Sequence, residues 1–441
     1  MIQLSRSRQI IQIALPIMGA MLSQNILNLV DTAMVGQIGS TALAAVGLAS
    51  IAAFLVQTPI LGISAGVQAI AARRLGENKI NESAYPLNAS IIISFVSCFI
   101  FIPLAFTLAP KLFAFLTNSE AVAEEAIKYF DIRMMAMFFL TVNYAFRGYW
   151  NAINQAEIYM KTLIVMHLSN IVMNYLFIFG NFGFPRMEVS GAALGTSLSI
   201  LLGFLIYLYQ ALKSLKANGF LKRKPSYDEI KSLVKISVPS GFEQFITMTG
   251  VLALYWIVGK IGTTEVATTN VLINIYLLAL LPAIAFGITL ASLSGQALGR
   301  GDKEDALLWG RDVLISAVIV ILFIGFGIFL FSDKILLVFT QDQSLIETGI
   351  LPLKIMGLSI AFEVIGFIFI HGLKGVGYSK EVMISSFVFQ WLLFLPIAYA
   401  LVHFFHVGLL SIWIVQISYR VIQSAFLAVM WQGGKWREQA L

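Results

Sequence analysis

Long apolar segments follow one another along the whole chain, separated by short stretches that contain Gly, Pro and charged residues. Each apolar segment is long enough to cross a bilayer as a helix, which takes about 20 residues. Closed β-barrels, the other structure that spans membranes, would show short segments of alternating hydrophobicity instead. The pattern therefore predicts an all-α membrane protein with twelve transmembrane helices. The predicted helices lie at about 9–35, 41–72, 84–108, 122–147, 157–181, 190–212, 231–258, 264–297, 306–331, 345–373, 381–402 and 408–432.

The second half of the chain repeats the first at an offset of 223 residues. Identical residues at this offset include Pro16 with Pro239, Pro59 with Pro282, and Thr117 with Thr340. Because each half has an even number of helices, both halves enter the membrane in the same sense and are related by a pseudo-twofold axis along the membrane normal. We predict an N-terminal six-helix bundle at 1–218 and a C-terminal six-helix bundle at 219–441. Such a duplication suits transport by alternating access.

Composition excludes a water-soluble globular protein. Of the 441 residues, 59% are hydrophobic and 12% are charged, whereas soluble domains average about half and about a quarter. Twelve spans of about 20 residues leave only short loops, with no room for a soluble catalytic domain. The single cysteine, Cys98, excludes a disulfide within the chain.

Lys and Arg residues gather in every second loop, and this pattern predicts the orientation. With the N-terminus in the cytoplasm, 21 of the 29 Lys and Arg residues fall on the cytoplasmic side and four on the outer side. The net charge of +6 is thus explained by topology without nucleic-acid binding. The apolar segment after Arg8 continues through polar residues without a small-residue cleavage site, so we read it as a retained first helix. We expect a multi-pass protein of the bacterial cytoplasmic (inner) membrane with both termini in the cytoplasm.

A polar stripe runs along the first predicted helix. Gln24, Asn28 and Asp31 follow i, i+4, i+7 spacing and therefore share one face of an otherwise apolar helix. In the repeat, Asp31 aligns with Leu254, so the carboxylate occurs in the first half only. Two interpretations stay open. The carboxylate either reaches the outer headgroups from a helix end, or it exchanges a proton or holds a cation within the protein.

Two amide side chains share a face of the fifth predicted helix, where Asn170 and Asn174 are four residues apart. Amides within membrane helices often only join neighbouring helices. Together with the stripe on the first helix, they would instead supply neutral ligands to a proton and water network or to a Na⁺ ion. The candidate cation-coupling site therefore consists of Asp31, Asn28, Asn170, Asn174 and Gln24.

Two glutamates in the second half are candidates for a second cation site. Glu363 lies in a run without any other charge, and such intramembrane carboxylates usually mark an ion or substrate path. Glu243 follows Pro239 near the start of the seventh predicted helix. His403 and His406 lack a third ligand, so we expect no metal site.

Sequence motifs for ATP use and for enzyme catalysis are absent. The chain has no G-x-x-x-x-G-K-[ST] phosphate loop, no H-E-x-x-H and no G-x-S-x-G. We therefore expect no enzyme activity and no cofactor. Transport would have to use an ion gradient, where each charge that crosses about 100 mV is worth about 2.3 kcal/mol.

At Asn28–Gly36 the sequence reads N-L-V-D-T-A-M-V-G, and at 238–244 it reads V-P-S-G-F-E-Q. These motifs, with the length and the duplication, resemble multidrug and toxic compound extrusion (MATE) transporters over the whole chain. The resemblance lies between the branch typified by the norfloxacin-resistance exporter and the damage-inducible F-like branch. It implies the export of organic cations in exchange for H⁺ or Na⁺.

The same resemblance implies roles for single residues. Asp31 occupies the position of the family's cation-coupling aspartate, and Asn170 looks like its partner asparagine. Asn174 falls where the damage-inducible F-like branch often has a second aspartate. Glu363 is similar to a tenth-helix acidic residue of the norfloxacin-exporter branch, whereas Glu243 lies too near Pro239 for its match to the seventh-helix glutamate to be assigned.

We therefore expect a monomeric secondary antiporter for multidrug efflux, with H⁺ favoured over Na⁺ as the coupling ion. Pro16 and Gly19 would allow the first helix to bend during the cycle. The alternative is a lipid-linked precursor flippase, which would need a markedly basic cavity to hold pyrophosphate. Few basic residues lie in the middle of a predicted helix to build one, namely Arg133, Lys354 and Arg420, with Lys128 nearer a helix end.

Overall fold

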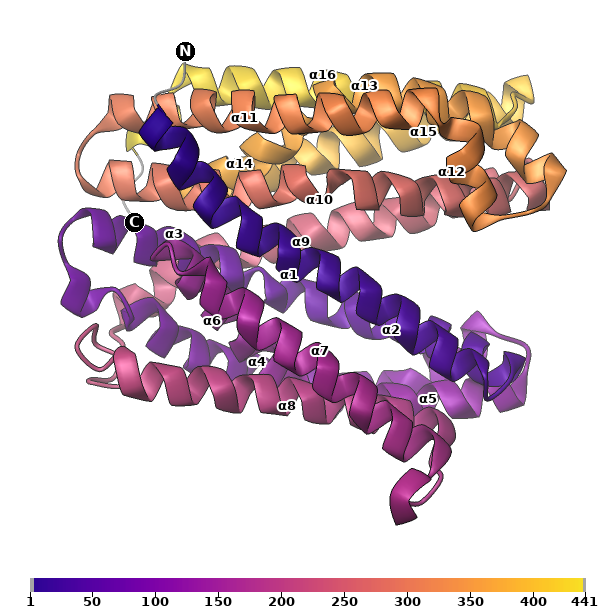
Figure 1. The fold of residues 1–441 in the computed structure, drawn as a ribbon, viewed down its shortest axis with the longest axis horizontal. Coiled ribbons are helices and arrows are strands. Elements are labelled where there is room, and N and C mark those ends of the chain that lie inside the picture. The colour runs from indigo at the N-terminus through magenta and orange to yellow at the C-terminus, as the bar shows by residue number, and fades with distance from the viewer. Residues whose placement is uncertain (1–3, 439–441) are drawn as a thin grey trace. The chain divides into compact units, whose positions relative to one another are not determined.

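The computed structural model describes residues 4–438, and the elements in that range are all helices, with no strand among them. The first half contains α1 (Leu4–Gly36), α2 (Ser40–Leu61), α3 (Ile63–Gly76), η1 (Ile80–Glu82), α4 (Tyr85–Leu116), α5 (Glu120–Met135), α6 (Met137–Ala152), α7 (Ala156–Phe179), η2 (Asn181–Gly183) and α8 (Glu188–Ser214) (Figure 1). The second half contains α9 (Tyr227–Val258), α10 (Thr263–Gly299), α11 (Lys303–Leu330), α12 (Ser332–Phe339), α13 (Gln343–Gly375), α14 (Ser379–Phe387), η3 (Val388–Phe394), α15 (Leu395–Phe405), α16 (Leu409–Gly433) and η4 (Lys435–Glu438). The predicted all-α class is confirmed.

Eleven helical stretches in this range are long and apolar enough to cross a membrane. The predicted span at 122–147 lies outside this set, because it is divided between α5 and α6, which have 16 residues each and meet at Ala136. No proline or glycine marks this break in the sequence. The sequence pattern therefore predicts one continuous helix where the structure has two shorter ones.

Two other predicted spans also contain local breaks. The span at 41–72 divides into α2 and α3 at Gly62, where an added Cβ would lie 2.8 Å from the Cα atom of Gly241 in α9. Only a glycine allows the two backbones to approach so closely. The span at 381–402 contains the π-helical turn η3, which is a common irregularity at functional sites.

The helix boundaries reproduce the sequence repeat. Five helical stretches of the second half begin 223 residues after their counterparts in the first half. The pairs of first residues are Leu4 and Tyr227, Ser40 and Thr263, Ile80 and Lys303, Glu120 and Gln343, and Ala156 and Ser379. The duplication therefore extends from sequence to local structure.

The chain folds into two compact units. The N-unit comprises Pro16–Gly241, and the C-unit comprises the described residues of Met1–Leu15 and Phe242–Leu441. Both divisions fall within a helix, α1 and α9 respectively. The first turns of each helix therefore belong to a different unit from the rest of that helix.

Each unit is a bundle of helices packed against one another. In the C-unit, α13 packs against α10, α11 and α16, which makes it the central helix of that bundle (Figure 1). In the N-unit, α8 packs against α7, α5 and α6, and α3 packs against α6. The pair of α7 and α8 positions the polar side chains described next.

Candidate functional site

Asp31 on α1 is held by two asparagines of α7. The Nδ2 atom of Asn174 donates to the Oδ1 atom of Asp31 at 2.8 Å. With the amide of Asn170 oriented so that its nitrogen faces Asp31, that nitrogen donates to the same oxygen at 2.9 Å. Asn170 and Asn174 are fully buried, whereas Asp31 is half-buried. The structure thus brings together three of the five residues of the predicted cation-coupling site.

Thr196 on α8 completes the surroundings of Asn170. In the orientation given above, the amide oxygen of Asn170 accepts from the hydroxyl and from the backbone N–H of Thr196, both at 3.2 Å. The neighbouring Gly195 lets α8 approach α7, because a Cβ there would lie 3.2 Å from the backbone nitrogen of Asn174. Sequence reasoning missed Thr196, since a single threonine in an apolar helix carries no spacing signal.

Gln24 and Asn28 belong to a second polar group, one to two turns away from Asp31 on α1. Gln24 donates through Nε2 to Oδ1 of Asn28 at 3.1 Å. Its Oε1 atom lies 3.2 Å from Nε2 of His167 on α7, and Nδ1 of His167 lies 3.0 Å from the hydroxyl of Ser23. Among the described residues, neither Gln24 nor Asn28 has a hydrogen bond to Asp31.

His167 is the second residue that sequence reasoning missed. It is buried, and with Asn170 and Asn174 it follows i, i+3, i+7 spacing on α7. This spacing places all three on the face that meets α1. The pattern was therefore visible in the sequence.

Asp31, Asn170 and Asn174 form what we call the Asp31 cluster. Its chemistry follows from the hydrogen-bond donors around the carboxylate. With Asn170 in the orientation given above, two amide N–H groups point at one carboxylate oxygen, and the other oxygen, Oδ2, has no hydrogen bond in the described part of the chain. The oxygen Oδ1 of Asn174 is buried and also without a hydrogen bond there. Arg133 on α5 adds a positive charge that acts on Asp31. The cluster can therefore hold a carboxylate charge and still accept a proton at Oδ2.

Glu243 and Glu363 have separate partners in the C-unit. Glu243 forms a buried ion pair with Lys374 of α13 and accepts from the hydroxyl of Thr247 at 3.2 Å. Glu363 accepts from the hydroxyl of Tyr276 and from that of Ser359, the latter at 3.3 Å. The charge of Glu243 is thus already balanced.

Lys374 is the residue whose role changes most from the sequence interpretation. By its position at a helix end it counts as a cytoplasmic loop residue, but the structure buries it to 4% exposure beside Glu243. Arg420 on α16 acts electrostatically on both glutamates. No hydrogen bond joins the two glutamates within the described residues.

The other residues singled out from the sequence form no polar cluster with Asp31, Glu243 or Glu363 among the described residues. Pro16 lies within the continuous helix α1, at the division between the two units. Gly19 faces α7, where an added Cβ would lie 3.1 Å from Sδ of Met160. His403 stacks on Tyr399 with ring centroids 5.4 Å apart. Residues 4–438 contain no group of three His, Cys, Asp or Glu side chains that would hold a metal ion.

The family model MatE matches two segments of the chain, residues 16–176 and 239–400. The chain belongs to the MATE family. It is therefore a multi-pass membrane transporter and not an enzyme. The two matched segments begin 223 residues apart, at the two prolines that open the sequence repeat, so each half of this MATE protein is one copy of the family unit.

Related proteins cover nearly the full length of this MATE chain. A probable multidrug resistance protein NorM of Thermotoga maritima is 28% identical over 440 residues, which span 98% of this chain and 94% of that one. The multidrug resistance protein NorM of Photobacterium profundum is 24% identical over 90% of this chain and 87% of that one. A solved structure described as an outward-facing multidrug resistance MATE transporter of the MOP superfamily has a TM-score of 0.90, with 20% identity over 99% and 97% of the two chains. This last similarity shows the fold.

Proposed function

We propose that this MATE protein exports organic cations across the bacterial cytoplasmic membrane in exchange for H⁺, by alternating access, with both termini in the cytoplasm. The relatives named multidrug resistance proteins support this substrate class. The observation that carries the proposal is the half-buried carboxylate of Asp31, held by the buried amides of Asn170 and Asn174. An ionisable group placed in this way within a membrane helix bundle is typical of an ion-coupling site.

The amide groups that surround Asp31 favour H⁺ over Na⁺ as the coupling ion. Sodium, like other hard cations, is bound by several oxygen atoms. The Nδ2 atom of Asn174 donates to Oδ1 of Asp31, so the amide of Asn174 would have to turn before its oxygen faced a Na⁺ ion bound at that carboxylate. A proton needs only the Oδ2 atom of Asp31.

The proposed cycle begins with Asp31 charged and a cationic drug bound. A proton from the outside then neutralises Asp31, which weakens its charge-assisted hydrogen bonds to Asn170 and Asn174. The contact between α1 and α7 loosens, α1 bends near Pro16 and Gly19, and the drug is released outward. Release of the proton to the cytoplasm restores the hydrogen bonds and resets the transporter.

The Asp31→Asn variant tests this function in cells. We expect it to insert in the membrane at the level of the unaltered protein but to lose resistance to ethidium and other cationic drugs. Asp333→Asn is the matched control, since Asp333 is an exposed aspartate in the first turn of α12. The measurement is the minimal inhibitory concentration at equal expression. Full resistance with Asp31→Asn would contradict the proposal.

A further inference from the structure

The segment that links α8 to α9 is folded against the start of α4. Asn88 of α4 donates to the carbonyl of Gly219 at 2.9 Å and accepts from the backbone N–H of Leu221 at 2.9 Å. The backbone N–H of Ala84 donates to the carbonyl of Asn218 at 3.1 Å. Phe220 is buried beside these bonds. These contacts hold the first half of the linker against the N-unit.

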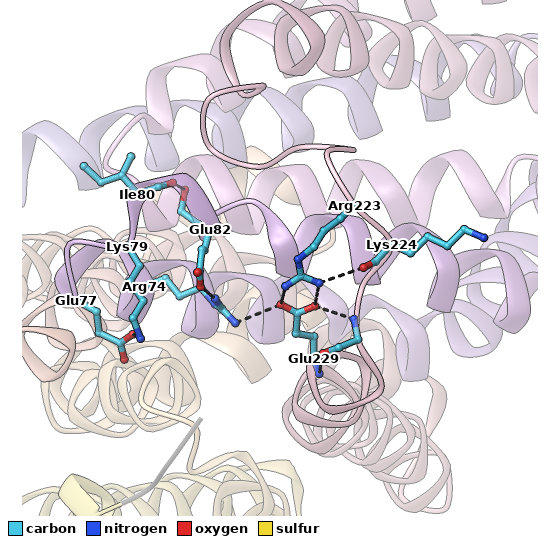
Figure 2. A network of polar contacts seen from close by, with 10 residues as sticks. Arg74, Glu77, Lys79, Ile80, Glu82, Arg223, Lys224 and Glu229 are labelled. Carbon is cyan, nitrogen blue, oxygen red and sulfur yellow. Dashed lines mark hydrogen bonds and ion pairs between the residues drawn. The ribbon is translucent and has the colours of Figure 1, made fainter.

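A charge network fixes the second half of the linker (Figure 2). Glu229 at the start of α9 pairs with Arg223 at 2.8 and 3.0 Å and with Arg74 of α3 at 3.5 Å. Arg74 also pairs with Glu82. Ser226 and Glu229 exchange hydrogen bonds as a capping box, in which each side chain accepts from the other residue's backbone N–H. Both arginines are thus neutralised within the protein.

Leu221 lies in an unfavourable backbone conformation with its side chain largely outside the fold. Its φ of 51° is in the left-handed region, which glycine and asparagine adopt more easily than leucine. Its side chain is nevertheless 56% exposed. A leucine in this position therefore contributes little to packing within the chain while it adds backbone strain. Such strain indicates that the side chain of Leu221 has a role outside the packing of the protein.

Six exposed lysines lie in the linker and in the adjoining turns of α8 and α9. None of them forms an ion pair within residues 4–438, and Figure 2 shows the side chain of Lys224 directed away from the charge network. The exposed ring of Tyr227 follows at the start of α9. The six are Lys213, Lys216, Lys222, Lys224, Lys231 and Lys235.

We propose that the segment 213–235, which is the linker with the adjoining turns of α8 and α9, is a binding surface for anionic phospholipid headgroups, with Leu221 inserted between the lipids. The linker joins the ends of two membrane-spanning helices, so its lysines lie near the headgroup layer. Clusters of four to eight Lys and Arg residues beside a membrane helix attract anionic lipids. An apolar side chain beside such a cluster adds membrane affinity through burial. This proposal does not rest on the coupling chemistry of Asp31.

The Leu221→Gly variant separates lipid binding from folding. Glycine relieves the backbone strain, so we expect the thermal midpoint in neutral detergent to stay equal or rise. Phosphatidylglycerol added to the detergent should raise the midpoint of the unaltered full-length protein more than phosphatidylcholine does. In Leu221→Gly, at least half of that difference should disappear. In a variant with Gln at Lys213, Lys216, Lys222 and Lys224 it should disappear entirely.

Phe182→Gly is the matched control, because Phe182 has a φ of 55° and an 86% exposed side chain but lies in the linker between α7 and α8. It should keep the full response to phosphatidylglycerol. Equal responses of the unaltered protein to the two lipids would overturn the proposal, as would a full response of Leu221→Gly. If inorganic phosphate alone gave the same rise, the surface would bind free anions and the assignment to lipid would be wrong.

Discussion

Asp31 meets its partners because polar residues repeat with helical spacing on two different helices. The i, i+4 pair Asn170 and Asn174 could be predicted from the sequence to share a face, and the structure places that face against Asp31. Spacing reports only which residues share a face of one helix, so it could not separate Gln24 and Asn28 from the cluster. It also could not reveal Thr196, which contributes from a third helix.

The ion pair of Glu243 and Lys374 shows the same limit in the C-unit. The two residues are far apart in the sequence, and only the fold buries them together. Their contact favours a structural role for Glu243 beside Lys374. Glu363, with only hydroxyl donors at its carboxylate, stays the better candidate for a second cation site.

Single substitutions in this pair should be costly. Glu243→Gln or Lys374→Gln leaves a buried charge without its partner, so we expect each to lower the free energy of unfolding by about 3–5 kcal/mol. The double variant should recover most of that loss and keep drug efflux, since no charge stays unpaired. Thermal unfolding in detergent and ethidium efflux are the measurements. If the double variant folds normally but has no efflux, Glu243 takes part in coupling after all.

At the scale of the helices, α1 and α9 are repeat partners whose first turns carry opposite charges. Arg6 of α1 pairs with Asp305 and with Asp312 of α11, each at 2.6 Å, and lies over the ring of Trp309. At the offset of 223, Arg6 corresponds to Glu229, which is anchored through Arg74 instead. Both copies of the repeat therefore have an ion pair at this position, but the residue on α1 is positively charged and the residue on α9 is negatively charged.

The lengths of most helices could be predicted from hydrophobicity, but their internal breaks could not. The break at Gly62 depends on the close approach of Gly241, and the break at Ala136 has no residue that marks it locally. Both breaks lie in the first half, while the equivalent helices α10 and α13 are continuous. Packing within each unit decides these details, at residue 62 through a glycine that permits close backbone contact.

The anchor of α1 should contribute measurably to stability. Arg6→Ala removes two charge-assisted contacts from side chains that are less than one-quarter exposed, so we expect a loss of about 1–3 kcal/mol. Arg8→Ala is the control, because Arg8 is exposed and forms no ion pair within the described residues. The midpoints of thermal unfolding of the two purified variants measure this contribution. Equal midpoints for the two would show that the anchor does not hold α1.

At the scale of the whole molecule, duplication explains the fold, and divergence of the two copies explains why the candidate coupling site is in one half. The twofold match of the family model and the repeated helix starts show that each half is one copy of the same unit. At the offset of 223, the cluster residues Asp31, Asn170 and Asn174 align with apolar residues, namely Leu254, Leu393 and Ile397. The repeat therefore predicts from the sequence that this cluster belongs to the N-terminal half alone.

Transport of ethidium in proteoliposomes under one imposed gradient at a time tests whether Asp31 couples drug export to H⁺ uptake. We expect a pH gradient without Na⁺ to drive transport by the unaltered protein, and we expect no transport by Asp31→Asn reconstituted at equal density. Transport by Asp31→Asn at the unaltered rate would contradict the role of Asp31. Transport that requires a Na⁺ gradient would contradict H⁺ as the coupling ion.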